Sequence, residues 1–269
     1  MFERLADALR RDEPVALATR LDGAAIGAKL LVCKGAAQGS LGNADLDRAV
    51  CEEARALLAA GETVVRTFGA AGEPLHSDVR VFIQSFAPKP DMYIFGAVDF
   101  SRAMVHVGKY LGYRVTIVDA RPVFATVARF PEADRVVVAW PHEFLASALL
   151  DERSVIVVLT HDEKFDIPLL AAALKTNSAY IGAMGSRATQ RRRVEQLRAL
   201  GIDQSELARI CAPIGLDLGA RTPEETAISI AAEIVALRGG RSGGRLSTGA
   251  GPVHGALRDH AWSSTTLSK

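Results

Sequence analysis

Apolar runs divide the chain into two parts with different patterns. In the first part, the segments VALATRL, GAKLLVC, TVVRTF and VRVFIQSF are short, and residues 44–60 carry a helical pattern. Short runs rich in β-branched and aromatic residues favour strands, and the longer pattern favours a helix. The turn KGAAQGSLG precedes this helix, and Asn43 is its predicted N-cap. The first part is therefore predicted to be a small α/β domain.

The second part contains apolar runs that alternate with helical stretches. The runs are MYIF, RVTIV, RVVVA, SVIVVL and AYIGAM. Strands that are buried on both faces, as in a parallel sheet covered by helices, have this β-branched composition. Residues 187–200 form a predicted basic helix, and Pro223 suits the first turn of a helix over residues 222–238. The fold class is therefore α/β, with a Rossmann-type doubly wound parallel sheet after the smaller domain.

Two prolines mark the predicted boundary between the domains. The segment Ala87-Pro88-Lys89-Pro90 can neither continue a helix nor lie in a central strand. After residue 238 the chain becomes rich in glycine and serine, a composition typical of flexible linkers. We therefore expect domains at residues 1–88 and 89–238 and a flexible tail at 239–269.

The composition of the chain limits which partners it can bind and which cellular compartment it suits. Charged residues make up 23% of the chain and the net charge is +1, without the basic excess of a nucleic-acid-binding protein. The three cysteines, Cys33, Cys51 and Cys211, have no metal-ligand spacing and no disulfide framework of the secreted kind. No apolar run approaches the roughly 18 residues that span a bilayer, and the first residues lack a secretion signal. The sequence predicts a cytoplasmic protein without a transmembrane segment or a nucleic-acid partner.

The segment from residue 91 to 121 has the order of a dinucleotide-binding unit: strand, tight turn, helix, strand and acidic residue. Its glycine signature is incomplete, because the three glycine positions hold Gly96, Val98 and Ser101. Asp119 follows Gly96 by 23 residues, which suits a carboxylate that binds a ribose hydroxyl or one that merely ends a strand. The pattern strongly predicts the fold and only weakly predicts a nicotinamide cofactor.

Polar residues follow several of the predicted strands at their carboxyl ends. In open α/β sheets a ligand binds beyond these ends, so we expect one crevice there. The amides that open helices, with Arg187, could bind an anion such as a phosphate. The candidate binding residues are Gly96, Ala97, Val98, Asp99, Asp119, Arg121, His161, Asp162, Gly182, Met184, Gly185, Ser186 and Arg187.

His161 and Asp162 allow two interpretations. They could act as an acid/base pair, since imidazole titrates near neutral pH beside a carboxylate. Alternatively, Asp162 or Asp166 could cap the helix that follows, in which Pro168 suits the first turn. A metal site is disfavoured because no second His or Cys stands at ligand spacing nearby. In the basic helix, Arg191, Arg192 and Arg193 cannot all face the crevice, and we expect His161→Ala and Arg187→Ala to weaken ligand binding and Arg193→Ala to change it little.

Taken in order, these motifs resemble the XdhC/CoxI family over nearly the whole chain. The resemblance depends on VALATRLDG, GAKLLV and GSLGNADLD in the first domain, and on IFGAVDFSRAM, LGYRVTIVDAR, LTHDEKFD, YIGAMGSR and PIGLDLGARTPEETAISIAAEIVA in the second. It implies an XdhC-type domain followed by a Rossmann-type domain. Many relatives have Gly-Ser-Ile-Gly-Gly-Gly-Cys where this chain has residues 39–45, and Gly-Ala-Gly-His where it has residues 96–99. Asp45 and Asp99 therefore replace a thiol and an imidazole.

The resemblance also implies a function. It implies an accessory protein that is a chaperone rather than a catalyst, binds molybdenum cofactor (molybdopterin) transiently, assists its sulfuration and inserts it into a xanthine dehydrogenase or carbon monoxide dehydrogenase. The implied partners are that apo molybdenum hydroxylase and a cysteine desulfurase, and the implied assembly is a homodimer. Two alternatives stay open: an NAD(P)-dependent oxidoreductase that uses the Rossmann-type domain, and a non-catalytic regulatory or scaffolding protein.

Overall fold

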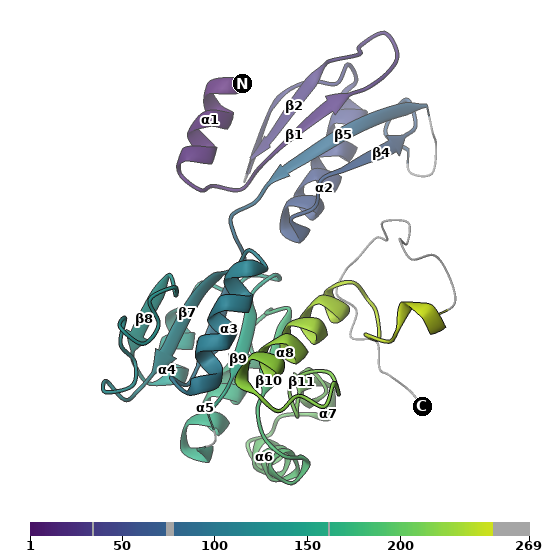
Figure 1. Ribbon diagram of the computed structural model, residues 1–269. Helices are drawn as coiled ribbons and strands as arrows, with labels where there is room; N and C mark the ends of the chain where they lie inside the picture. Colours follow the sequence, from purple (N-terminus) through teal and green to yellow (C-terminus); the bar gives the residue numbers. More distant parts are fainter. Residues whose placement is uncertain (34, 74–77, 161, 250–269) are drawn as a thin grey trace. The chain divides into compact units, whose positions relative to one another are not determined.

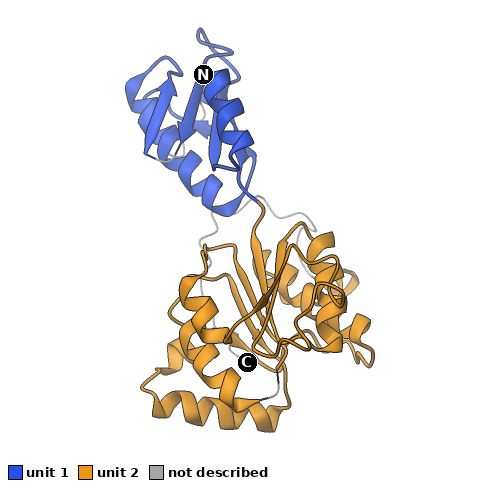
Figure 2. Cartoon of the chain, turned by 90° about the vertical axis from the view of Figure 1, so that its left-hand side faces the viewer, with its two compact units in different colours: residues 1–88 blue, residues 89–269 orange. Residues whose placement is uncertain are grey.

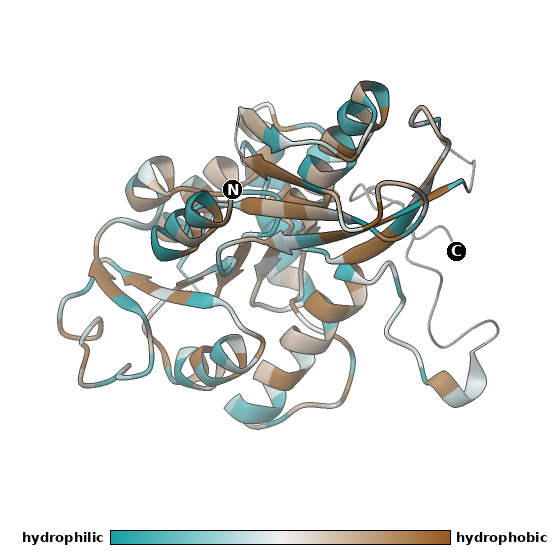
Figure 3. Cartoon of the chain, turned by 90° about the horizontal axis from the view of Figure 1, so that it is seen from above, coloured by the Kyte–Doolittle hydropathy of each residue, from teal (hydrophilic) through white to brown (hydrophobic). Residues whose placement is uncertain are grey.

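The computed structural model describes residues 1–33, 35–73, 78–160 and 162–249 (Figure 1). Their contacts divide the chain into two compact units, Met1–Pro88 and Lys89–Lys269 (Figure 2). Helices in both units alternate brown and teal segments in Figure 3, as expected when one face is buried and the other meets solvent. Within the described residues, no helix combines the length and the apolar character needed to cross a membrane.

The first unit contains a five-stranded antiparallel sheet with the order β3-β2-β1-β5-β4. Four of its strands, and the bounds of the long helix α2, agree with the sequence prediction. The fifth was missed: residues 36–39 form a short edge strand where a turn was expected. The strands are β1 (Val15–Arg20), β2 (Lys29–Cys33), β3 (Ala36–Gly39), β4 (Val64–Phe68) and β5 (Val79–Phe86).

Two helices cover the two faces of this sheet. The helix α2 (Ala44–Ala60) packs its apolar side on one face, in a cluster that includes Leu46, Val50 and Leu57. The helix α1 (Phe2–Arg10) covers the other face. The Asn43 side chain accepts a hydrogen bond of 2.8 Å from the Asp45 amide, so the predicted N-cap is confirmed.

The second unit contains a six-stranded sheet with the order β11-β10-β9-β6-β7-β8, and all of its strands are parallel. The chain order reverses between β6 and β9, as in a Rossmann fold. The predicted fold class is therefore confirmed. The strands are β6 (Asp91–Phe95), β7 (Arg114–Asp119), β8 (Arg135–Val138), β9 (Val155–Val158), β10 (Tyr180–Ala183) and β11 (Ile210–Cys211).

Helices cover both faces of the parallel sheet. One face packs against α3 (Asp99–Tyr110) and α8 (Pro223–Arg238), which contribute Met104 and Ile230 to the first core cluster. The opposite face packs against α4 (Pro141–Ser147), α5 (Glu163–Ala173), α6 (Arg187–Ala199) and α7 (Gln204–Leu207). A short 3₁₀ helix, η1 (Leu246–Thr248), lies in the glycine-rich segment.

Three details of the second unit differ from the sequence prediction. The edge strand β8 was expected to be buried, but Val138 is 51% exposed because only one strand pairs with it. The two-residue strand β11 was missed, since two residues carry no periodic pattern. Pro168 lies inside α5 rather than in its first turn, because the helix already begins at Glu163.

Candidate functional site

Most of the predicted binding residues lie at the carboxyl ends of neighbouring strands, at one edge of the parallel sheet, but Gly182 is buried inside β10. The strands β10, β9, β6 and β7 are neighbours in that order, and the loops that follow their carboxyl ends carry the candidates. Residues 96–99 follow β6, Asp119 ends β7, Asp162 follows β9, and residues 184–187 follow β10. The ligand edge of a doubly wound sheet is formed in this way. His161, one of the candidate binding residues, lies outside the described residues.

The turn after β6 is held tightly against the loop after β9. Gly96 has φ +108°, a conformation that favours glycine, and a Cβ there would lie 2.8 Å from Cγ2 of Thr160 and 3.1 Å from its amide nitrogen. The Ser101 hydroxyl donates to the Gly96 carbonyl oxygen from the first turn of α3. Ser101 is buried, so the third position of the glycine signature is filled by a side chain that ties the turn to its helix.

Asp119 anchors the same turn from the neighbouring strand. Its carboxylate accepts hydrogen bonds from the Ala97 amide (2.7 Å), the Arg121 amide (2.9 Å), and Nε and Nη2 of Arg121 (2.9 and 2.8 Å). A carboxylate can accept about four hydrogen bonds, and these four N–H donors occupy all of its acceptor positions. A ribose hydroxyl at Asp119 would therefore have to displace one of these donors.

These hydrogen bonds give Asp119 a pH-dependent effect on stability. Burial alone would raise the pKa of this carboxyl, but the Arg121 side chain and the Ala97 and Arg121 amides outweigh burial and hold the pKa below its usual value. A lowered folded-state pKa stabilises the fold above the unfolded pKa of roughly 4, and this contribution is lost as the pH falls through the folded-state value. Asp119→Asn should lower the free energy of unfolding by about 1–3 kcal/mol at pH 7.

Denaturant unfolding of both proteins between pH 7 and pH 3 checks this prediction. The difference between them should shrink as the pH falls below about 4, because Asp119 is protonated there in the unfolded chain before it is protonated in the folded protein. A difference that stays constant over the whole range would contradict the role given to the ionised carboxylate.

A buried ion pair lies behind the loops that follow β9 and β10. Arg193 and Asp166 are both 1% exposed, and an Arg193 Nη2 hydrogen bonds to Asp166 Oδ2. The Thr160 hydroxyl donates to the other Asp166 oxygen, and Arg193 Nη1 donates to the Met184 carbonyl oxygen at 2.7 Å. This cluster connects both loops. Arg193 is therefore a buried structural residue, because α6 turns this arginine toward the sheet while Arg192 is exposed, and the small effect of Arg193→Ala on ligand binding stays a prediction.

Of the two interpretations of Asp162, capping is the one with a contact in the structure. Its side chain accepts a hydrogen bond of 3.0 Å from the Lys164 amide at the start of α5. Ser186 caps α6 in the same way, by accepting from the Thr189 amide at 3.1 Å. Arg187 is exposed at the first residue of α6, so its guanidinium is accessible to an anion.

Aromatic rings and cations lie at this edge, and of these residues the sequence predicted only Arg121 as a binding residue, while Phe124, Trp140, Lys164 and Phe165 were missed. The Arg121 guanidinium lies 4.5 Å from the centre of the Phe124 ring. The Trp140 and Phe165 ring centres are 5.3 Å apart, and the Lys164 ammonium lies 5.0 Å from the Trp140 ring centre. Their positions could have indicated them, since Trp140 comes two residues after β8 and Phe165 lies in the first turn of the helix that follows β9.

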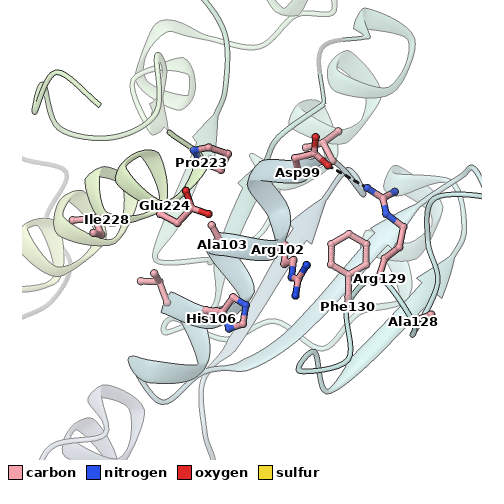
Figure 4. A pocket seen from close by; sticks show the side chains of 12 residues that line it. Asp99, Arg102, Ala103, His106, Ala128, Arg129, Phe130, Pro223, Glu224 and Ile228 are labelled. Carbon is pink, nitrogen blue, oxygen red and sulfur yellow. Dashed lines mark hydrogen bonds and ion pairs between the residues drawn. The ribbon is translucent and has the colours of Figure 1, made fainter. Parts of the chain in front are cut away.

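A hollow of about 810 Å³ adjoins the edge on the outer side of α3 (Figure 4). Arg102 and His106 line it from α3 and Glu224 lines it from the start of α8. Arg129 closes one end, where it donates to the Ala97 carbonyl oxygen at 3.0 Å and lies 3.5 Å from the Asp99 carboxylate. Of the predicted binding residues that the structure describes, only Val98 and Asp99 line this hollow. Its cations and carboxylates are mixed, so it does not select for one sign of charge.

Two of the three cysteines lie in environments that keep their thiols protonated. Burial raises the pKa of the Cys51 thiol, and burial together with the Glu233 carboxylate raises the pKa of Cys211 to about 12. Both thiols are therefore protonated and poorly nucleophilic at neutral pH. In the part of the chain that the structure describes, no three His, Cys, Asp or Glu side chains are grouped so that they could hold a metal ion.

Two family models match the chain. The XdhC Rossmann domain matches residues 92–234, and the XdhC and CoxI family matches residues 8–69. A crystal structure of a xanthine dehydrogenase from Bacillus halodurans is similar with a TM-score of 0.54, over 91% of this chain and 97% of that chain. At 21% sequence identity this similarity shows the fold alone.

Two bacterial relatives match parts of the chain. A probable xanthine dehydrogenase subunit from Bacillus subtilis (strain 168) is 30% identical over 158 residues, which are 59% of this chain and 46% of the relative. The molybdenum cofactor insertion chaperone PaoD from Escherichia coli (strain K12) is 36% identical over 93 residues, which are 35% of this chain and 29% of the relative. The matches cover less than half the length of each relative. With more than half of its residues matched by the Rossmann-domain model, the chain belongs to the XdhC and CoxI family.

Proposed function

We propose that this protein is an accessory factor that binds molybdenum cofactor and delivers it to a molybdenum hydroxylase of the xanthine or carbon monoxide dehydrogenase type. The observation that carries the proposal is the 36% identity to a molybdenum cofactor insertion chaperone, in a chain whose second unit matches the XdhC Rossmann domain. We further propose that the cofactor is bound transiently, that its sulfuration involves a cysteine desulfurase, and that the factor acts in the cytoplasm as a homodimer.

The charge of the sheet edge supports this ligand. Arg121, Lys164 and Arg187 follow the carboxyl ends of β7, β9 and β10, three of the four neighbouring strands at the edge. Molybdenum cofactor combines a planar pterin with a phosphate, so cations beside aromatic rings suit it. The proposed cofactor-binding residues are those predicted from the sequence, with Gly96 and Asp119 shaping the site and Arg121 and Arg187 meeting the anion.

The proposed role is that of a carrier rather than a catalyst. The Asp119 carboxylate accepts from four donors and an Asp162 oxygen caps α5, which gives both carboxylates a structural role in holding the loops. A nicotinamide cofactor is disfavoured by Val98, whose side chain packs against the first core cluster where the usual glycine lets a pyrophosphate approach.

Equilibrium binding tests the proposal. Purified protein is expected to bind molybdenum cofactor, transferred anaerobically from a denatured molybdoenzyme, with a Kd in the micromolar range or below. Arg187→Ala should weaken binding by about threefold to thirtyfold, because a charge-assisted hydrogen bond contributes roughly 1–2 kcal/mol. Arg191→Ala, four residues further along α6 and also exposed, is the matched control and should leave the Kd unchanged.

A parallel titration with NADH separates this function from the oxidoreductase alternative. Tight binding of NADH without binding of the pterin cofactor would reverse the order of the two hypotheses. Reconstitution of an apo molybdenum hydroxylase by the loaded protein, with and without a cysteine desulfurase, then tests delivery and sulfuration separately.

A further inference from the structure

Trp140, Phe165 and Lys164 form a compact cluster at the mouth of the site. The two ring planes are inclined at 42°, and the Lys164 ammonium lies 5.8 Å from the centre of the Phe165 ring as well as 5.0 Å from that of Trp140. Trp140 is 38% exposed, although the Phe165 ring packs beside it, so a large apolar side chain remains partly open to solvent. The cluster therefore leaves part of the Trp140 indole and the exposed Lys164 side chain accessible to solvent.

Backbone hydrogen bonds tie this cluster to the candidate site. The Ala139 amide, one residue before Trp140, donates to the Asp119 carbonyl oxygen at 3.2 Å. The Phe165 amide donates to the Asp162 carbonyl oxygen at 2.9 Å. The Asp162 carboxylate in turn lies close enough to raise the pKa of Arg121, although the larger cause is the Asp119 hydrogen bond. The cluster thus flanks the loops that carry Asp119 and Asp162.

Two of these residues stand where local helix energetics disfavour them. Trp140 occupies the position before α4 at which Ser, Thr, Asp or Asn would accept a hydrogen bond from the helix, and its side chain makes no such bond. Lys164 is in the first turn of α5, where the helix dipole disfavours a cation. No carboxylate among the described residues forms an ion pair with its ammonium. Residues that break local rules in this way commonly serve a ligand.

We infer that this cluster is a stacking platform: a planar pterin ring lies against the exposed indole of Trp140, and the Lys164 ammonium neutralises an anionic group of the same molecule. This inference rests on the proposed function and specifies how its ligand is held. Stacking of a heteroaromatic ring on an aromatic side chain is tolerant of substituents, which suits a carrier that must hold its cargo and release it.

The first test uses pterin-6-carboxylate as a soluble anionic probe and a Trp262→Phe protein, in which Trp140 is the remaining tryptophan. The indole N–H signal of Trp140 in ¹H–¹⁵N NMR spectra should shift on titration, because ring-current shifts act only over a few ångströms. Trp140→Leu should raise the Kd for the probe by about tenfold, and Trp140→Phe should retain most of the affinity. Tyr110→Leu, at an aromatic side chain that is 91% exposed elsewhere in the unit, should change nothing.

The second test separates the ring from the charge. Lys164→Gln should raise the Kd for pterin-6-carboxylate about threefold at low salt. It should leave the Kd for unsubstituted pterin, which lacks the carboxylate, unchanged. Inorganic phosphate alone should not shift the Trp140 signal. Unchanged thermal unfolding of each variant shows that the fold is intact.

Measurements with molybdenum cofactor itself keep the two proposals apart. If the wild type and Trp140→Leu bind the cofactor equally tightly, the platform is overturned and the proposed function stands. If pterin-6-carboxylate shifts the indole signal but the protein takes up no molybdenum cofactor, the platform stands and the proposed function is overturned.

Discussion

Arg193→Ala is expected to lower the free energy of unfolding of the second unit by about 3–5 kcal/mol. Arg193 and Asp166 pair with almost no contact with solvent, so removing the guanidinium takes a charged hydrogen-bond partner away from a buried carboxylate. The Met184 carbonyl oxygen also loses its donor from Arg193. Denaturant unfolding followed by the fluorescence of Trp140, in a Trp262→Phe background, reports on this unit.

Two controls identify the buried pair as the cause. Arg192→Ala removes a neighbouring arginine whose side chain is 65% exposed and 3.4 Å from Glu163, and it should cost less than about 1 kcal/mol. The double variant Asp166→Leu/Arg193→Met should be more stable than Arg193→Ala, because it leaves no isolated buried charge. If the Arg193→Ala protein and the wild type unfold at the same denaturant concentration, the buried ion pair contributes nothing to the stability of the unit.

Gly96→Ala is expected to have the second largest effect, a loss of about 2–4 kcal/mol together with loss of cofactor binding. A new Cβ would be strained at φ +108° and would meet the backbone of Thr160, which cannot rotate away as a flexible side chain could. The loop after β9 would have to move, and it carries Asp162 and Lys164. Unfolding in denaturant and equilibrium dialysis with molybdenum cofactor measure the two effects.

Gly112→Ala is the matched control for Gly96→Ala. Gly112 has φ +86°, but no atom lies within 4 Å of an added Cβ. This variant therefore carries backbone strain without overlap, and we expect a loss of about 1 kcal/mol and unchanged binding. Equal losses in the two variants would mean that the close contact between the turn after β6 and the loop after β9 has no effect.

The sequence alone allowed correct prediction of most elements and of the edge where the candidate residues gather. Runs such as SVIVVL and helix starts such as Asn43 depend on neighbours within a few residues, so their pattern is visible in the chain. The parallel order of the strands followed from the alternation of strands and helices. The short strands β3 and β11 were missed because four and two residues are too few to show a period.

The three consecutive arginines of α6 show where this reasoning fails. A helix cannot turn all three to one side, so the sequence indicated that they differ but not which one is buried. Leu197 gave a signal that could have been used, since it lies four residues after Arg193 on the same helical face and is fully buried. The Arg193 guanidinium can be buried on this face of α6 because Asp166 on α5 lies opposite it, and only the tertiary structure shows this position.

The sequence by itself determined the class of fold, the family and the set of loops that meet at one edge of the sheet, because these depend on local periodicity and on the order of motifs. The tertiary structure decided which contacts each side chain makes there. The Asp119 carboxylate accepts hydrogen bonds from Ala97 and Arg121, and the Trp140 ring lies beside the Phe165 ring. The physical reason is that hydrogen bonding, burial and stacking depend on atoms brought together from distant parts of the chain, and no local pattern records them.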